Sequence, residues 1–370
     1  MRIIPLMYVK EEHTLGRTLF DTDHRLLLRA GTPISKAHKT RLQEGGYFSV
    51  YVEDDYTHYK PSPIIPDQLR DNCLAIIRDA FKDFKTYMEL EKAEQTLGNK
   101  NKLQKMMGNR NEKIENILEI ADRVLLDLED HQLSRIEYVE PKNMYDYPYQ
   151  HALNTGILAS LIGFRMNRNV NEIRSMFISS ILCEMGNLMI PRDILFKKGR
   201  LTPDEFETVK NHCNISYHQV NTLPELNYMI KMICLEHHEK VDGSGYPKGL
   251  DGDQMNIMSR IVSVADAYDA MTSDRTYRMA YPPHKAIEYL KSMSGVHYDE
   301  DVVYVLTSII QPFPIGTIVS LNTKQYGVVI DDNEFEPLRP KIKLLSDEVE
   351  SEIDLTNHRS MAITGIKYSV

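Results

Sequence analysis

The segment His-His-Glu-Lys-Val-Asp-Gly-Ser-Gly-Tyr-Pro, residues 237–247, constrains this chain more than any other. It joins two adjacent imidazoles and a carboxylate to a turn that contains two glycines and a proline. Residues 226–235, just before it, carry apolar side chains at the three-and-four spacing of a helix with one buried face. Because Asp-Gly, Ser-Gly and Pro interrupt helices, the chain must turn sharply after the two histidines. The sequence therefore predicts a helix end whose loop aims both imidazoles into one cavity.

Metal binding is the chemistry that this segment favours. A neutral imidazole is the commonest protein ligand for metals, although a lone histidine at a helix end is more often an ordinary polar residue. Two other segments, both rich in apolar residues, also carry a carboxylate: Glu184 near the end of 177–187, and Asp266 within 263–271. A buried carboxylate is costly unless it is paired or bound to a metal. The sequence therefore predicts a metal cluster built from these carboxylates and several histidines.

Composition limits the remaining classes of protein. A length of 370 residues predicts two or three domains. The chain contains no apolar run of about 18 residues and no signal-peptide pattern at its start, so we expect a cytoplasmic protein without membrane insertion. The net charge of −9 argues against DNA or RNA binding, which needs a broad positive surface. The four cysteines form no Cys-x-x-Cys pair and predict neither a zinc knuckle nor a disulfide framework.

The order of patterns along the chain predicts a mainly α protein, with a helical-bundle domain flanked by small β-rich units. Residues 1–60 are predicted to form a β-rich N-terminal domain with one helix over 35–44. Residues 312–370 are predicted to form a second small β-rich domain, a sheet or barrel. Residues 141–311 lie between them and hold the expected metal ligands.

Residues 61–140 are predicted to form a helical connector. Two amphipathic helices are expected there, separated by a polar loop near 98–101 and 108–109. The apolar faces of these helices, within 67–133, could form a hairpin, pack on the next domain or make a homodimer seam.

Residues 145–310 resemble the HD-GYP family, a bacterial subgroup of the HD metal-dependent phosphohydrolases that hydrolyses cyclic di-GMP. The loop Asp-Gly-Ser-Gly-Tyr-Pro at 242–247, after His-His-Glu, is the most specific match. Collinear support comes from the segments 149–151, 190–191, 201–206, 264–269 and 272–278, and from His212. The resemblance implies a helical HD-type domain, two divalent metal ions (Fe, Mn or Zn) and cyclic di-GMP as the partner.

One departure separates this chain from the family pattern. Where the family has His-Asp-x-Gly-Lys, the chain reads Cys-Glu-Met-Gly-Asn at 183–187. A thiolate is a softer ligand than imidazole and favours zinc, whereas glutamate can bridge two metals as aspartate does. The metal ligands that the resemblance implies are His151, Cys183, Glu184, His212, His237, His238 and Asp266.

The resemblance implies hydrolysis of cyclic di-GMP to linear pGpG or GMP. Glu184 and Asn187 occupy catalytic positions of the family, and the substrate contacts carried over are Tyr246, Arg275 and Arg278. Asn187 is neutral where the family lysine adds positive charge near the phosphate. Loss of one such contact commonly costs about 10²–10³ in rate. A catalytically degenerate domain that binds cyclic di-GMP or a partner protein is therefore the alternative, and a hydrolase for another nucleotide is a third reading.

Overall fold

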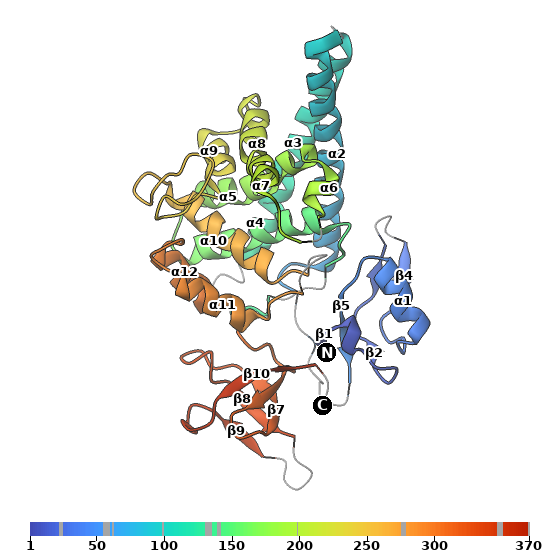
Figure 1. Ribbon diagram of the computed structural model, residues 1–370, viewed down its shortest axis with the longest axis vertical. Coiled ribbons are helices and arrows are strands. Elements are labelled where there is room, and N and C mark those ends of the chain that lie inside the picture. The colour runs from blue at the N-terminus through green and yellow to red at the C-terminus, as the bar shows by residue number, and fades with distance from the viewer. Residues whose placement is uncertain are drawn as a thin grey trace.

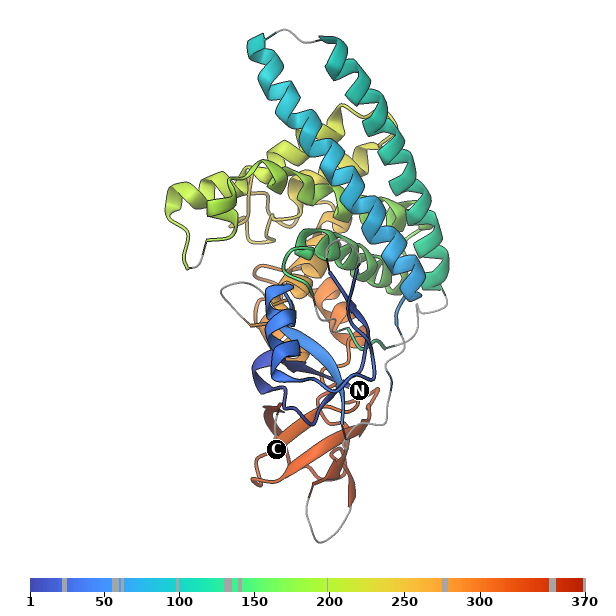
Figure 2. The ribbon, with the colours of Figure 1, turned by 90° about the vertical axis from the view of Figure 1, so that its right-hand side faces the viewer.

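The computed structural model describes residues 1–21, 25–54, 60, 63–97, 100–129, 135–138, 142–197, 199–274, 279–345 and 351–368; the side chains of 94–97 and 100–106 lie outside this description. Helices fill one end of the molecule and two small β units lie at the other (Figure 1). A long hairpin of two helices stands along one side of the helical part, as both views show (Figure 2). The mainly α fold class, with β-rich units at both ends, is confirmed.

The N-terminal unit is a small sheet with one helix. Its three-stranded sheet has the order β1 (Arg2–Pro5), β5 (Ser49–Glu53) and β2 (Thr14–Leu15), and β3 (Leu19–Phe20) pairs with β4 (Leu26–Leu28). A short 3₁₀ helix, η1 (Leu6–Tyr8), follows the first strand. The predicted helix is α1 (Lys36–Glu44), which begins at a capping box between Ser35 and His38.

The helical hairpin consists of α2 (Asp67–Leu97) and α3 (Lys100–Glu129). The expected loop was wrong for residues 100–109, because α3 already runs through them; residues 98–99 lie outside the described ones. Gly108 lies on the exposed face of α3, where a glycine costs only about 1 kcal/mol and does not end a packed helix. The apolar faces of α2 and α3 join the hydrophobic core of the central helices, so the hairpin packs on the next domain.

The central helices form one core around α4 (Tyr147–Arg165), which is buried on all sides from His151 to Gly163. α4 begins at Tyr147, which places His151 in its second turn. The other central elements are α5 (Val170–Leu182), η2 (Cys183–Met189), α6 (Arg192–Leu195), α7 (Pro203–Lys210), α8 (His212–Asn221), α9 (Tyr228–Glu236), α10 (Ile257–Met271), α11 (Pro283–Ser292) and α12 (Glu300–Ile309).

The C-terminal unit is an antiparallel five-stranded sheet, as the strand patterns predicted. Its order is β10 (Ile363–Lys367), β6 (Ile318–Leu321), β7 (Tyr326–Asp331), β8 (Lys341–Leu344) and β9 (Glu352–Asp354). Its inner face has a separate small core that includes Val319, Val329 and Ile342. Among the described residues, no helix combines the length and apolar character that crossing a membrane would require.

Candidate metal centre

The predicted helix end and loop are present, and a buried carboxylate organises them. α9 ends at Glu236, and His237 and His238 follow at once. Glu239 is fully buried, and its two oxygens accept hydrogen bonds from the backbone N–H groups of Lys248 (2.6 Å) and Leu250 (3.0 Å). Glu239 therefore folds the loop back on itself and leaves the two histidines to form the site.

η2 lies close against α8. This contact places Cys183 and Glu184, the pair that differs from the family pattern, beside the histidines. A Cβ atom on Gly186 would lie 2.1 Å from the carbonyl oxygen of His212, so only glycine fits there. The Ser216 hydroxyl donates to the carbonyl of Cys183 (2.6 Å) and accepts from the N–H of Gly186 (2.8 Å). These contacts explain why the glycine of the His-Asp-x-Gly-Lys frame is present in this chain.

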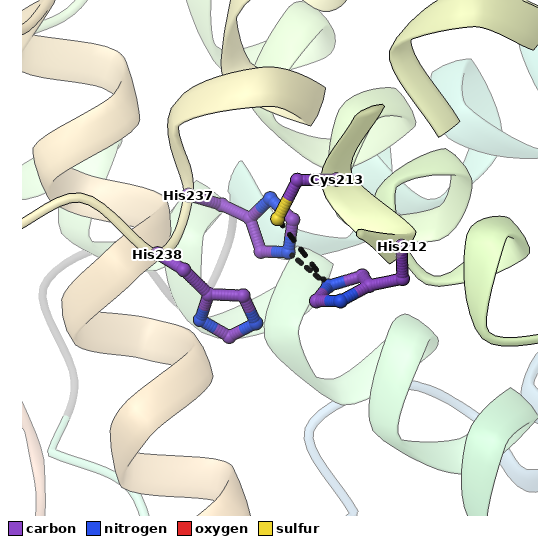
Figure 3. Close-up of side chains that lie close together, drawn as sticks. All are labelled: His212, Cys213, His237 and His238. Atoms are coloured by element: carbon purple, nitrogen blue, oxygen red, sulfur yellow. Dashed lines mark hydrogen bonds between the residues drawn. The ribbon is translucent and has the colours of Figure 1, made fainter. Parts of the chain in front are cut away.

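The first half of the centre, the imidazole half, consists of His212, Cys213, His237 and His238. One ligand atom from each of these side chains lies within 4.8 Å of the others. Figure 3 shows the sulfur of Cys213 and the rings of His212 and His237 converging on one point, with His238 beside them. Burial, together with the neighbouring His212, lowers the pKa of His237 to about 4, so this imidazole is neutral at pH 7 and able to bind a cation.

The second half, the carboxylate half, consists of His151, Glu184 and Asp266, again within 4.8 Å of one another. His151 bridges two carboxylates: Nε2 lies 2.9 Å from Asp266 Oδ1, and Nδ1 lies 2.6 Å from Asp269 Oδ2. Although burial opposes it, hydrogen bonding to these carboxylates raises the pKa of His151 to about 9. Without a metal, His151 is therefore a buried imidazolium between two anions.

Asp269 is held in turn by the buried ammonium group of Lys142, whose Nζ lies 2.6 Å from Asp269 Oδ2. Burial alone would raise the pKa of Asp269, but Lys142 and His151 lower it to about 2. A carboxylate that accepts the Nδ1–H of a histidine fixes which nitrogen faces a metal. Asp269 therefore orients the Nε2 atom of His151 toward Asp266 and Glu184.

Cys183, Glu184 and His237 form a third group, which links the two halves. Cys183 is 2% exposed, and burial raises the pKa of its thiol well above the ordinary value, so in the protein without a cation it is neutral. The side-chain amide of Asn187 donates to Glu184 Oε2 at 2.7 Å. Asn187 thus fixes the carboxylate of Glu184.

A cavity of about 210 Å³ opens onto this centre. The predicted residues that line it are His151, Glu184, Asn187, His212, His238, Tyr246 and Asp266, whereas Cys183 and His237 lie behind its wall. The carboxylates in its wall are Glu184, Asp266 and Asp274, and none of the described lining residues is a lysine or arginine. A phosphate diester would be repelled by this wall until cations neutralised it. Arg275 and Arg278 lie outside the described residues.

The donor set fits divalent cations. Imidazole nitrogens, carboxylate oxygens and thiol sulfurs from separate elements converge at the site, and the carboxylate oxygens of Glu184 and Asp266 face a cavity whose described lining includes no lysine or arginine. Two carboxylates on one side and three imidazoles on the other could hold one cation each. The chain therefore has groups that could hold metal, as the sequence predicted.

Three residues that contribute to the site were not predicted from the sequence. Lys142 precedes the central helices and showed no pattern of its own. Asp274 lines the cavity and accepts a hydrogen bond from Ser49 Oγ at 2.8 Å, which ties the N-terminal sheet to the site. Cys213 adjoins the predicted ligand His212 in the sequence, and that adjacency could have identified it.

Comparisons with known proteins agree with this geometry. Residues 131–302 match the family model described as HD domain, and residues 318–366 match the KOW domain associated with HD domain. The chain is 27% identical over 226 residues to the cyclic di-GMP phosphodiesterase PA4108 of Pseudomonas aeruginosa, covering 61% of this chain and 54% of that one. It is 31% identical to the cyclic di-GMP phosphodiesterase PdeB of Borreliella burgdorferi, covering 55% and 54%.

A relative named for another cyclic dinucleotide also matches. The 3'3'-cGAMP-specific phosphodiesterase 1 of Vibrio cholerae is 29% identical over 135 residues, which cover 36% of this chain and 30% of that one. The chain spans about half the length of the first two relatives. The HD-domain match includes the metal centre, whereas the hairpin and the N-terminal sheet lie before it.

Proposed function

We propose that the chain is a metal-dependent phosphodiesterase of the HD type, because residues 131–302 match the HD-domain model and the cavity has the matching chemistry. Its proposed reaction is hydrolysis of cyclic di-GMP to linear pGpG or GMP in bacterial second-messenger signalling. The observation that carries the proposal is the convergence of His151, Glu184, Asp266, His212 and His238 on one cavity. Relatives named cyclic di-GMP phosphodiesterases support this choice of substrate.

The residues of the cavity would divide the work. Two divalent metal ions (Fe, Mn or Zn) would supply an activated water and neutralise charge on the phosphate. Glu184 and Asp266 supply the anionic ligands, and Asp269 orients His151. Asn187 fixes the Glu184 carboxylate and therefore acts as a positioning residue. Because Asn187 is neutral where the family has lysine, the bound cations would have to supply the positive charge near the phosphate.

The walls around the metal centre suit a nucleotide. Tyr147, Phe196 and Tyr246 line the cavity together with aliphatic side chains, and such rings can stack on a purine base. Tyr246 lies with its ring centroid 4.9 Å from that of His238, so a base stacked there would lie beside the metal ligands. Arg275 and Arg278 complete the proposed phosphate contacts, on the strength of the family resemblance.

Several finer points accompany this proposal. We propose cyclic di-GMP as the partner and no role for DNA or RNA, a cytoplasmic location, and a homodimer through the helices of residues 67–133. We also propose the four domains as 1–60, 61–140, 141–311 and 312–370. The acidic net charge is compatible with the absence of a role for DNA or RNA.

The test is elemental analysis of the anaerobically purified full chain, combined with turnover of cyclic di-GMP on the same sample. We expect bound metal and hydrolysis, with 3'3'-cGAMP as the competing substrate. Metal without turnover, together with tight binding of cyclic di-GMP, would establish the degenerate binder instead. Faster turnover of 3'3'-cGAMP would overturn the choice of substrate but not the reaction class.

Restoring the family residues sharpens this test. The triple change Cys183→His, Glu184→Asp and Asn187→Lys should leave turnover of a working enzyme equal or lower. If the restored protein instead hydrolyses cyclic di-GMP far faster than the native chain, the native site is degenerate. Asn187→Lys alone separates the effect of charge in the cavity from the change of ligands.

A further inference from the structure

The imidazole half of the centre contains a sulfur atom with no role in the proposed hydrolysis. We propose that His212, Cys213, His237 and His238 form a tetrahedral zinc site in which the thiolate of Cys213 is the fourth ligand (Figure 3). The site uses the same centre as the proposed function, but the inference rests on the arrangement of its four side chains and not on hydrolysis.

The distances between the ligand atoms match the edges of a zinc tetrahedron. With Zn–N bonds of about 2.0–2.1 Å and a Zn–S bond of about 2.3 Å, two nitrogens lie about 3.3 Å apart, and a nitrogen and a sulfur about 3.6 Å apart. His212 Nε2 lies 3.2 Å from His237 Nε2, and Cys213 Sγ lies 3.5 Å from His212 Nε2. Two of the three separations among these atoms therefore match those of ligands of one ion, and the third is within 4.8 Å.

The hydrogen bonds on the far side of the rings point to the same conclusion. His212 Nδ1 lies 2.7 Å from the carbonyl oxygen of Val209, and His237 Nδ1 lies 3.1 Å from that of Cys234. A carbonyl only accepts, so each Nδ1 carries a proton, and in a neutral ring Nε2 then presents a lone pair. With both rings neutral, two lone pairs face each other at 3.2 Å, an arrangement that a cation bound by both nitrogens, or a proton on one of them, stabilises. Carbonyl acceptors behind metal-bound histidines are the usual supporting arrangement.

The imidazole half differs from the carboxylate half in the burial and in the number of its ligands. His212 is 2% exposed and Cys213 and His237 are fully buried, whereas His238 is half-buried and lines the cavity with His212. Four protein ligands fill a tetrahedral zinc ion and leave no open position, which is the character of a structural site, so the activated water of the proposed hydrolysis would belong to the ion of the carboxylate half. A thiolate and three imidazoles prefer zinc over manganese, whereas carboxylates accept harder ions. The centre would thus hold zinc in one half and an exchangeable ion in the other.

Cobalt substitution of the full chain tests the sulfur ligand directly. Co²⁺ bound to a thiolate gives an intense charge-transfer band in the near ultraviolet, and tetrahedral Co²⁺ gives strong visible bands. We expect both in the native chain loaded with one equivalent of Co²⁺. Cys213→Ala should lose the near-ultraviolet band and bind zinc at least about 100-fold more weakly in competition with a chelator. Cys213→Ser provides a second variant of nearly the same volume should the alanine protein not fold.

Cys234→Ala is the matched control, because Cys234 is equally buried and close by but its sulfur is outside the group of four. It should keep the band and the zinc affinity. Cys183→Ala should keep both as well; if it alone loses the band, Cys183 is the sulfur ligand and the proposal is wrong. Absence of the band in the native chain would also overturn it. None of these outcomes depends on turnover, so the proposed hydrolysis can fail while the zinc site stands, and the reverse.

Discussion

The two halves of the metal centre are built by opposite means. In the carboxylate half, His151 lies between Asp266 and Asp269, and Lys142 holds Asp269 from behind. In the imidazole half, backbone carbonyls hold the rings of His212 and His237. The carboxylate half is therefore a buried ionic network that keeps its shape without a cation, whereas the imidazole half gathers nitrogen and sulfur atoms at the spacing of metal ligands. The comparison teaches that neighbouring ligands in one centre can be suited to different ions.

The sharpest way to separate the halves is to remove a ligand from one of them. Asp266→Asn removes an anionic ligand and one of the two carboxylates that contact His151. Turnover of cyclic di-GMP should therefore fall by on the order of 10³. Zinc in the imidazole half should stay, which elemental analysis of the same sample would show. Asp253→Asn, which removes an exposed carboxylate of the same charge, serves as control and should leave both quantities unchanged. Loss of all metal from Asp266→Asn would mean that the halves are one indivisible site.

Removing the Asp269 carboxylate behind His151 should lower the stability of the fold more than it lowers the affinity for metal. Asp269→Asn removes the carboxylate that contacts the buried Lys142 ammonium, and breaking such a buried pair costs about 3–5 kcal/mol. Chemical unfolding of chelator-treated protein measures this loss directly. Zinc affinity of the imidazole half should not change, because no hydrogen bond connects Asp269 to that half among the described contacts. A drop in zinc affinity would contradict the separation.

The stability lost in Asp269→Asn should depend on pH, because the pKa values of Asp269 and His151 are both shifted in the folded protein. The pKa of Asp269 is lowered from 3.8 to about 2, so its contribution is complete above 3.8 and disappears as the pH falls through about 2. The pKa of His151 is raised from 6.5 to about 9, so its contribution is complete below 6.5 and disappears as the pH rises through about 9. In metal-free protein, the stability difference between native chain and Asp269→Asn should therefore be largest between pH 4 and 6.5. A difference that grows above pH 9 would contradict this assignment.

The sequence predicted the positions of the histidines better than their partners. Helix breakers after residue 238 fix where α9 ends, so His237 and His238 were placed correctly from local chemistry alone. Lys142 could not be found in this way, because its partner Asp269 is distant in the chain and only the packing of α10 brings them together. Gly108 misled the prediction of a loop, since the packing of α3 outweighs the small cost of one exposed glycine. Local rules therefore locate ligands, and tertiary packing decides what supports them.

The same limit explains Cys183 and Cys213. The family frame drew attention to Cys183 because it stands at a known ligand position, and the structure does place it near Glu184 and His237. Cys213 has no such frame, and its sulfur reaches the rings only because α8 begins at His212 and packs against α9. The packing of α8 against α9 decides which sulfur can bind metal. The sequence pattern of either helix alone does not predict this.

The smallest expected effect concerns Asn187, which touches only the carboxylate half. Asn187→Ala removes the 2.7 Å hydrogen bond to Glu184 Oε2, and a bond to a charged group is worth about 1.5–3 kcal/mol. Water in the cavity can replace part of it, so turnover should fall only about tenfold. Asn187→Asp should do more damage than alanine, because a second carboxylate would repel Glu184 at the same place. Zinc affinity should stay native in both variants. If alanine and aspartate behave alike, Asn187 does not act through Glu184, and the carboxylate half is positioned by its ionic network alone.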